Sequence, residues 1–555
     1  MKPSANSHTS TNTINPADLR QESIFVGLLA ALASFLAYAY CFPRGMLLLY
    51  GDAVAHLGIA RRLTDSLSPG IRQLGSVWLP LPHLLMAPFA INLYWWQSGI
   101  AGAIPSMLFY LVSVIGLYRL ARVWLSPVMA CVAVAFYGLN PGLLYMQTTA
   151  MTEPLYLAEV VWGVLLLVEI GRTLQENNFP AAARRIITAA IVLDAAVLTR
   201  YDGWVFACLG WFIVAYFFWQ YRAAFQSRAG GAFVFFTIAL VTAPTSWFLW
   251  NARVFGDWLY FARGPYSAKA IAARTTPPGA SHYPGWHNAW VSLLYFLKAS
   301  ELGMVNMPLT DVLLTVSILG TIAALWFWRG KLLLPLALLW MPVPFYAFSV
   351  AYGSVPIFLP VWPPHSYYNT RYGMEMLPTF ALFTAFFFAA LLRWTQKRKP
   401  VLAPIVTALA LSLVLLDCAA QIHLGPLVLA EARANSQTRI PYEKAYARVL
   451  DSLPPYGEIL AYTSAHIGAF QIAGIPLRRT INEGDYYQWK AALKHPALAA
   501  PFIVATNGDP VYKAIQKHPG GLISLEVVCS TGQPCAHFYR SKRVGLDGSI
   551  TPKRP

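Results

Sequence analysis

The stretch IFVGLLAALASFLAYAYCF, residues 24–42, decides the broad class of this chain. It holds no charged residue, and its length suits a helix that crosses a bilayer, which needs about 20 apolar residues. No clear small-residue cleavage site follows it, so we expect it to stay as a membrane span and not to be removed as a signal peptide. The polar residues before it, 1–23, are predicted to be disordered.

The rest of the chain repeats this apolar character. Of 555 residues, 57% are hydrophobic and 12% are charged, whereas a soluble domain carries about 25% charged residues. Apolar runs predict about eleven membrane helices. They lie near 24–43, 102–121, 127–145, 153–171, 186–200, 204–221, 231–250, 304–328, 332–350, 375–392 and 401–419. We therefore predict a mainly α-helical, polytopic membrane protein.

The formal net charge is +17, and the basic residues are unevenly spread. Short connections such as 119–122 and 393–399 are rich in Arg and Lys, whereas the opposite connections near 146–152 and 200–203 hold almost none. The positive-inside rule then places the N-terminus in the cytoplasm. An odd number of spans places everything after about residue 420 outside. Short loops without a large insert favour a bacterial plasma membrane.

These patterns divide the chain into three parts. They are a cytoplasmic N-terminus (1–23), a transmembrane domain (24–420) with outer loops at 44–101, 251–303 and 351–374, and an extracytoplasmic α/β domain (421–555). Within the first outer loop, the apolar but proline-broken residues 78–94 are predicted to form a surface or re-entrant helix.

The last part differs from the rest because strand-like and helix-like segments alternate. GEILAYT (457–463), PFIVAT (501–506) and SLEVVC (524–529) resemble short buried strands. Cys529 and Cys535 lie close together in CSTGQPC, which allows either a disulfide in an oxidising compartment or two free thiols.

Polar residues that could form a site collect in the outer loops. Asp52 and His56 are four residues apart and share one helical face, although Asp52 could equally cap that helix. Glu153 lies in TEP (152–154), which is also a good helix start. Arg200 and Asp202, in LTRYDGW, could pair only with each other.

Two further groups have the same two interpretations. His365, Tyr368, Arg371 and Tyr372 lie in WPPHSYYNTRY (362–372), which is either part of a substrate site or an interfacial aromatic belt. Arg61 and Arg62 suit either a lipid phosphate or simple headgroup contact. The sequence places all of these residues on the outer side at similar depth, which favours a site.

Taken together, these residues resemble the GT-C membrane glycosyltransferases, and most closely the group with protein O-mannosyltransferases and the lipid A aminoarabinose transferase. The likeness spans most of residues 24–420. The motifs that carry it are YGDAVAH (50–56), WLPLPHLLMAP (78–88), TEP (152–154), LTRYDGW (198–204) and RYGMEMLP (371–378).

The resemblance implies an inverting transfer of a sugar from a polyprenyl-phosphate carrier to a lipid, glycan or protein acceptor. Asp52 would then be the general base, because an acceptor hydroxyl must lose its proton. Glu153 would orient a substrate, and Arg371 and Arg200 would stabilise the departing phosphate, with Arg61 or Arg62 as alternatives. His56, Asp202, His365, Tyr368 and Tyr372 would contact substrate.

One departure and several alternatives accompany this interpretation. Protein O-mannosyltransferases carry an adjacent Asp-Glu pair in the first outer loop, whereas here Asp52 precedes Ala53. No cofactor is required, although Asp52, His56 and Glu153 could hold a divalent metal. The rival functions are a lipid-linked sugar transporter or flippase, and a cell-envelope receptor or assembly protein. We expect membrane lipids as partners and no nucleic acid.

Overall fold

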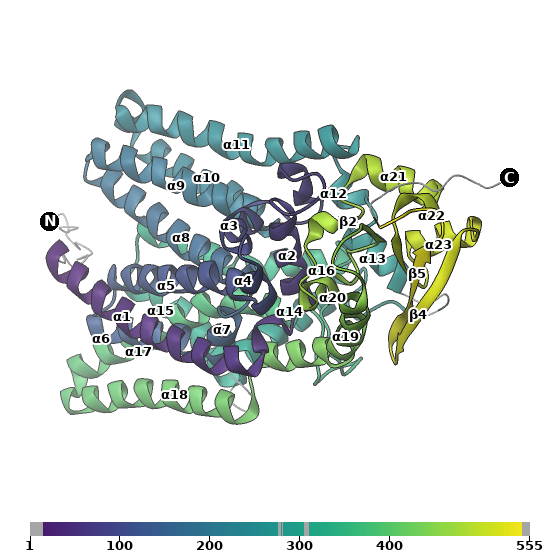
Figure 1. Cartoon of the computed structure of the whole chain (residues 1–555). Coiled ribbons are helices and arrows are strands. Elements are labelled where there is room, and N and C mark those ends of the chain that lie inside the picture. Colours follow the sequence, from purple (N-terminus) through teal and green to yellow (C-terminus); the bar gives the residue numbers. More distant parts are fainter. Residues whose placement is uncertain (1–14, 276–278, 280, 305–309, 547–555) are drawn as a thin grey trace, which may run out of the picture.

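The computed structural model describes residues 15–275, 279, 281–304 and 310–546. The prediction of disorder over 1–23 is wrong for residues 16–23, which form the start of a helix, and residues 1–14 lie outside the described residues. Helices make up most of the described part, and the longest of them run side by side through the left half of Figure 1. A small sheet lies at the opposite end of the molecule from the N-terminal helix. The predicted class, a mainly helical protein with a small C-terminal α/β unit, is confirmed.

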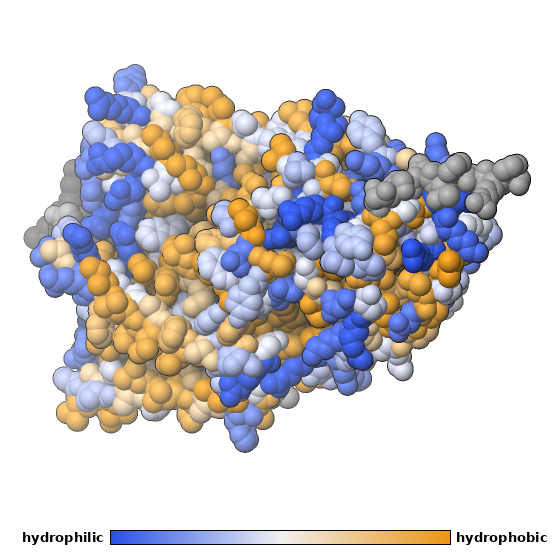
Figure 2. Space-filling view, in the orientation of Figure 1, coloured by the Kyte–Doolittle hydropathy of each residue, from blue (hydrophilic) through white to orange (hydrophobic). Residues whose placement is uncertain are grey.

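Eight helical segments among the described residues are long and apolar enough to cross a membrane. They are Pro16–Arg44, Ile100–Arg122, Glu153–Gln175, Asp202–Gln220, Arg228–Phe255, Lys331–Tyr352, Thr370–Arg398 and Pro400–Ser452. Figure 2 shows apolar surface over the left half of the molecule, bordered by hydrophilic residues at the left edge. The chain is therefore an integral membrane protein.

Five long helices form a row in which each one packs on the next. The order in space is α1 (Pro16–Cys41), α5 (Ile100–Arg122), α8 (Glu153–Gln175), α9 (Phe179–Thr199) and α11 (Arg228–Phe255). Helix α8 lies in the middle of this row, and its apolar residues are almost all buried. A helix that is apolar all round must be surrounded by others, so the first residue of α8, Glu153, is fixed in the interior.

A second group of helices covers this row. It contains α6 (Pro127–Gly138), α7 (Pro141–Met146), α10 (Asp202–Gln220), α15 (Thr310–Phe327), η5 (Lys331–Trp340), α16 (Pro342–Tyr352), α17 (Leu377–Arg398) and α18 (Ala403–Leu424). The span predicted over 127–145 is two helices, because Pro141 disfavours helical geometry at the residue before it. Asn140 there caps α7 through its side-chain oxygen, which accepts from Leu143 N at 3.0 Å.

Several shorter elements and the long helix α19 lie between the membrane helices and the sheet. They are α2 (Gly51–Arg62), α3 (Leu81–Ala90), α4 (Leu93–Ser98), α12 (Tyr260–Arg263), α13 (Ala268–Thr275), α14 (Ala289–Met304), η6 (Thr370–Met376) and α19 (Leu427–Ser452). The proline-broken stretch 78–94 contains α3 and the start of α4, so the helix predicted there is present but interrupted.

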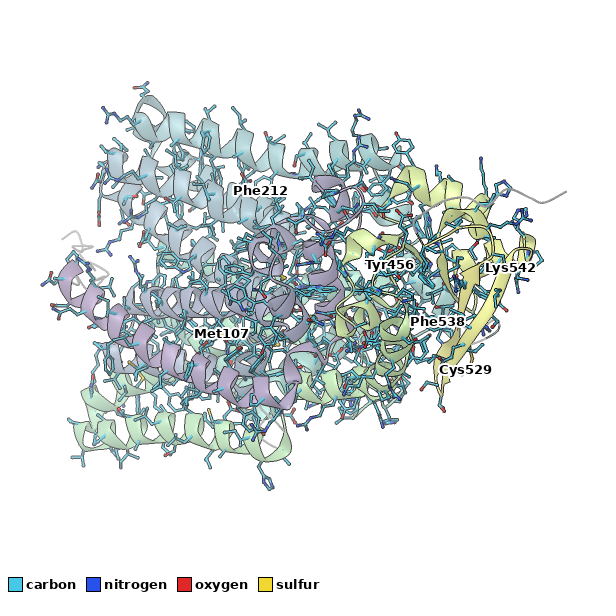
Figure 3. All side chains as sticks on the ribbon, in the orientation of Figure 1. Met107, Phe212, Tyr456, Cys529, Phe538 and Lys542 are labelled. Atoms are coloured by element: carbon cyan, nitrogen blue, oxygen red, sulfur yellow. A yellow bond between two sulfur atoms is a disulfide. The ribbon has the colours of Figure 1, made fainter. Side chains whose placement is uncertain are left out.

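The C-terminal sheet has the strand order β2-β1-β3-β5-β4. Its strands are β1 (Ile459–Ala461), β2 (Thr480–Ile481), β3 (Phe502–Thr506), β4 (Leu522–Ser530) and β5 (Gln533–Ser541), and its helices are α20 (Ile467–Ile472), α21 (Tyr486–Lys494), α22 (Pro496–Ala499) and α23 (Pro510–Lys517). Strands β2, β1 and β3 are parallel, whereas β5 is antiparallel to both its neighbours. Cys529 lies beside the turn of the β4–β5 hairpin and forms a disulfide with Cys535 (Figure 3).

The sheet domain is held against the segment that follows α1. The carboxylate of Asp65, just after α2, accepts hydrogen bonds from the backbone of Leu477 at 3.2 Å and Arg478 at 3.3 Å. The side chain of Gln471 donates to the carbonyl of Trp96 at 2.5 Å. The position of α2 is therefore set jointly by the membrane helices and by the C-terminal domain.

Candidate active site

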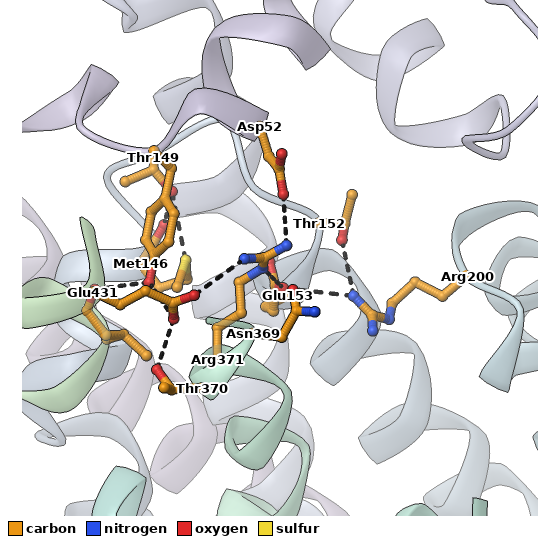
Figure 4. A network of polar contacts seen from close by, with 12 residues as sticks. Asp52, Met146, Thr149, Thr152, Glu153, Arg200, Asn369, Thr370, Arg371 and Glu431 are labelled. Atoms are coloured by element: carbon orange, nitrogen blue, oxygen red, sulfur yellow. Dashed lines mark hydrogen bonds and ion pairs between the residues drawn. The ribbon is translucent and has the colours of Figure 1, made fainter. Parts of the chain in front are cut away.

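Arg371, in η6, is the centre of a buried charged network (Figure 4). Its guanidinium group donates to Oδ2 of Asp52 at 2.5 Å and forms ion pairs with Glu153 at 3.2 Å and with Glu431 at 3.6 Å. These three carboxylates come from α2, α8 and α19. Three segments that are far apart in the sequence therefore meet at one side chain.

Arg200, in the turn between α9 and α10, extends the network. It pairs with Glu375 at 3.0 Å, with Asp202 at 3.2 Å and with Glu153 at 3.5 Å. It also donates to the hydroxyl of Tyr346 at 2.7 Å, and that hydroxyl donates in turn to Glu375 at 2.6 Å. The simple Arg200–Asp202 pair considered from the sequence is present, but only as one part of a larger cluster.

Glu153 lies between the two arginines and is 1% exposed. Both of its oxygens are buried without a hydrogen-bond partner among the described residues, so ion pairs and the N-terminus of α8 are what balance its charge. Thr152, which precedes it, does not cap the helix with its side chain and instead accepts from Arg200 at 3.2 Å. Helix capping alone therefore does not account for this segment.

Glu431, near the start of α19, closes the other side of the network. Its second oxygen accepts hydrogen bonds from Thr370 at 2.6 Å and from Tyr50 at 3.1 Å. Burial, followed by the charge of Glu431, raises the pKa of Tyr50 well above its usual value, so this phenol stays protonated and able to donate. Glu431 lies beyond the domain boundary predicted at residue 420, which means that α19 contributes to the same site as the membrane helices.

Asp52 is the carboxylate of the network that faces open space, since its side chain is 41% exposed. Helix α2 begins at Gly51, and no side chain caps it. One oxygen of Asp52 is held by Arg371, and among the described residues the other has no hydrogen-bond partner. The helix-cap interpretation of Asp52 is therefore wrong, and its carboxylate is oriented but accessible.

His56 does not contact Asp52, although both lie on α2. Its Nδ1 lies 2.8 Å from Nε2 of His83, and its ring packs on Trp78 with the centroids 4.2 Å apart. Burial, followed by the charges of Arg371 and Arg200, lowers the pKa of His56 to about 3. Burial likewise lowers the pKa of His83 well below its usual value. This histidine pair is therefore neutral at physiological pH.

A cavity of about 2510 Å³ opens over the network. Most of the residues predicted for the site line it: Asp52, His56, Arg62, Glu153, Arg200, Asp202, Tyr368, Arg371 and Tyr372. Arg61 does not, because its guanidinium group is bound to Asp65 at 2.7 Å and to the carbonyl of Ala90 at 2.8 Å. His365 does not line the cavity either. It is exposed, and its Nδ1 lies 3.1 Å from the carbonyl of Pro360.

The metal ligands considered from the sequence do not converge. Arg371 stands between Asp52 and Glu153, and His56 is bound to His83. A guanidinium group between two carboxylates repels a divalent cation. Within the described part of the chain, no group of three or more His, Cys, Asp or Glu side chains is arranged to hold a metal ion. The residues present therefore do not fit a metal in this arrangement.

Members of the network that were not selected from the sequence include Tyr50, Tyr346, Thr370, Glu375 and Glu431. Glu375 lies in RYGMEMLP, four residues after Arg371, so helical spacing could have identified it. Glu431 lies in a polar stretch with no distinctive neighbours. Only the packing of α19 against η6 brings it to Arg371.

Comparisons with known proteins give a structural likeness only. No protein-family model and no curated protein matches the chain. ArnT from Cupriavidus metallidurans bound to undecaprenyl phosphate is similar with a TM-score of 0.54 and 13% identity over 92% of this chain and 97% of that one. The apo state of ArnT gives a TM-score of 0.51 with the same identity and coverage.

A third similar structure, the Archaeoglobus fulgidus oligosaccharyltransferase, has a TM-score of 0.42 and 12% identity over 92% of this chain and 72% of that one. The two ArnT structures cover nearly the whole of both chains. They show that this chain has the fold of ArnT, the lipid A aminoarabinose transferase that the sequence resemblance names.

Proposed function

From this fold and the charged network, we propose that the protein is a membrane glycosyltransferase. It moves a sugar from a polyprenyl-phosphate-linked donor to an acceptor on the extracytoplasmic face, in a bacterial plasma membrane. The fold is that of ArnT, which has been solved with undecaprenyl phosphate bound. The observation that carries the proposal is the carboxylate of Asp52, which is fixed through one oxygen and open to the cavity through the other.

Asp52 acts as the general base in this proposal. The acceptor hydroxyl attacks the anomeric carbon of the donor sugar while its proton passes to the free oxygen of Asp52. The bond between the anomeric carbon and the phosphate oxygen breaks, and the polyprenyl phosphate leaves with that electron pair. A single displacement of this kind inverts the anomeric centre. Arg371 keeps Asp52 oriented throughout.

The roles of the two arginines follow from the charge balance. The network contains five carboxylates, those of Asp52, Glu153, Asp202, Glu375 and Glu431, and two guanidinium groups. With every carboxylate ionised it repels a phosphate, so Arg371 and Arg200 chiefly position the acidic residues.

We propose that Arg439 donates a hydrogen bond from its Nε to the leaving phosphate. It lines the cavity beside Gly51, next to Asp52. Its charge is already shared with Glu443 at 2.5 Å and it donates to the carbonyl of Leu48 at 2.7 Å, but its Nε is buried without a hydrogen-bond acceptor among the described residues.

The test follows release of free polyprenyl phosphate from labelled polyprenyl-phosphate sugars in membranes that contain the protein. We expect Asp52→Asn to lower this release about 10²–10⁴-fold, because the amide cannot accept the proton. Asp451→Asn is the matched control, since Asp451 is an exposed aspartate on α19. It should leave the rate unchanged.

Other outcomes would redirect the proposal. Equal release by the Asp52→Asn variant and the native chain would exclude Asp52 as the base and make Glu153 the next candidate. Release by neither, with every donor tested, would favour the transporter or receptor functions, in which Asp52 is dispensable.

A further inference from the structure

The C-terminal sheet presents a distinctive edge to the cavity. Its three parallel strands have the order β2-β1-β3, so the chain leaves the central strand β1 first to one side and later to the other. In open parallel sheets, ligands bind beyond the carboxyl ends of the strands at the point where the order reverses. Here that point lies between β1 and β3.

The loops at this edge open into the same cavity as Asp52. Tyr462, Thr463 and Ser464 follow β1, Glu483 follows β2, and Asp509 follows β3, and all five line the cavity. The sheet therefore directs the edge at which α/β domains bind ligands toward the proposed reaction centre.

An ion pair fixes this edge to the helix of the general base. Arg62 of α2 contacts Glu483 at 3.2 Å, and Glu483 also accepts from the backbone of Thr463 at 2.9 Å and from Ser464 at 2.5 Å. Arg62 is ten residues after Asp52, which corresponds to about 15 Å along a helix. A substrate that contacts both Asp52 and this edge must therefore be extended.

Aromatic side chains form the wall between the edge and the outer loop. The hydroxyl of Tyr266, in the loop between α12 and α13, lies 2.6 Å from that of Tyr462. The ring of Trp489, on α21, is stacked on Tyr462 with the centroids 6.2 Å apart. Burial raises the pKa of both tyrosines, so each keeps a hydroxyl that can donate. Flat apolar faces beside hydroxyl groups suit a saccharide, which is itself amphipathic.

Unpaired cations outnumber unpaired carboxylates on the cavity wall in the described residues. The carboxylate of Asp509 accepts hydrogen bonds from the backbone N–H groups of Thr506 at 2.8 Å and Tyr512 at 2.6 Å, and Glu483 is paired with Arg62. Five cations that line the cavity have side chains without an ion-pair or hydrogen-bond partner in the described part of the chain. These cations, which we call the basic rim, are Arg72, Arg253, Lys269, Arg274 and Lys513.

We propose that this edge of the sheet and the facing outer loop form a distal acceptor subsite for an extended, anionic saccharide head group. This inference rests on the proposed function, because it assigns the bound molecule as the acceptor whose far end reaches Asp52. The aromatic wall contacts sugar rings, and the basic rim pairs with phosphate or carboxylate groups on them. Small neutral acceptors do not engage the subsite.

Equilibrium binding to the full-length protein in phosphatidylcholine nanodiscs tests the subsite. The probes are a phosphorylated mannopentaose, neutral mannopentaose, mannose 6-phosphate and inorganic phosphate. We expect the phosphorylated pentasaccharide to bind most tightly, because it alone offers both length and charge. The double variant Arg274→Gln/Lys513→Gln should weaken this binding about tenfold, and Trp489→Ala should also weaken it.

Matched controls come from the opposite side of the sheet domain. Tyr456 precedes β1 and is 58% exposed, and Lys542 follows β5 and is exposed (Figure 3). Tyr456→Ala and Lys542→Gln should bind the probe as the native chain does. Retained elution as a folded species on gel filtration separates loss of binding from loss of fold, and the exposed rim cations can be neutralised even if Trp489→Ala fails to fold.

Several results would overturn the proposal. They are equal binding of neutral and phosphorylated pentasaccharide, binding of inorganic phosphate that matches the pentasaccharide, or equal weakening by Lys542→Gln. Displacement of the probe by phosphatidylglycerol vesicles and not by excess unlabelled pentasaccharide would identify a lipid surface instead. The Asp52→Asn variant should still bind the probe. The subsite and the proposed catalytic function can therefore fail independently.

Discussion

Arg371 and Arg200, in the charged network, share five carboxylates, whereas the cations of the basic rim have no partner within the described residues. Both regions line one cavity. A buried, fully paired charge is costly to remove because its partners are then left uncompensated. An exposed, unpaired charge contributes little to the fold and remains available to a ligand. The comparison separates residues that build the site from residues that recognise a substrate.

The largest difference should come from one guanidinium group in each region. We expect Arg371→Gln to lower the free energy of unfolding by about 3–5 kcal/mol, because three carboxylates lose their shared cation. Arg274→Gln should change it by less than about 0.5 kcal/mol. Thermal unfolding of both variants in the same detergent measures the difference. Similar losses in the two variants would remove the distinction between the regions.

Acid should destabilise the fold in part through the buried pair of His56 and His83. Because burial lowers the pKa of His56 to about 3 and lowers that of His83 as well, the unfolded chain binds protons that the folded chain does not. Stability is therefore fully present above pH 6.5, the ordinary histidine value, and falls as the pH decreases below it. Each histidine contributes at most about 1.4 kcal/mol per pH unit.

The measurement is the slope of unfolding temperature against pH between neutrality and about pH 5. The double variant His56→Gln/His83→Gln should have a shallower slope than the native chain, whatever its absolute stability. His365→Gln is the control, since His365 is exposed and outside the cavity, and it should keep the native slope. An unchanged slope in the double variant would show that the histidine pair does not titrate as its burial requires.

The smallest effect on the fold should come from the rim itself. We expect Arg72→Gln/Lys269→Gln to shift the free energy of unfolding by no more than about 0.5 kcal/mol, because both side chains are exposed. The same variant should make anionic-saccharide binding depend less on ionic strength. Dissolved salt weakens binding by screening the rim cations, and the variant has fewer of them. A large loss of stability would show that these cations have structural partners in the folded protein.

Local patterns were sufficient to predict the helical part of the fold. An uninterrupted apolar run in a membrane forms a helix, because the backbone has to satisfy its own hydrogen bonds there. Each of the eleven predicted spans overlaps helix in the described residues, but only eight helical segments there are long and apolar enough to cross a membrane. The strands were harder to predict. Segments at β1 and β3 were recognised as buried strands. The segment at β4 was recognised as a strand, but its predicted burial is wrong because most of its residues are exposed. β2 has only two residues and β5, QPCAHFYRS, mixes polar and apolar residues, so neither was recognised. Pairing with neighbouring strands determines both.

In the candidate site, too, some features follow from neighbouring residues in the sequence and others depend on contacts between distant segments. The segments that carry Asp52, Glu153, Arg200 and Arg371 could be predicted because each lies at a boundary between an apolar run and a polar motif. Which atoms pair could not be predicted from the sequence. His56 lies near Asp52 in sequence but pairs with His83, and Glu431 becomes a partner of Arg371 only through the packing of α19.

The position of Glu431 also bears on how the protein is made. Ribosomes synthesise the chain from its N-terminus, so Asp52, Glu153 and Arg371 exist well before the residue that completes the ion-pair cluster around Arg371. Until α19 packs against η6, Arg371 lacks its third carboxylate, and Tyr50 and Thr370 lack their shared acceptor. Assembly of the reaction centre is thereby tied to completion of the polypeptide, and nascent chains that end before α19 carry the sequence motifs without the assembled centre.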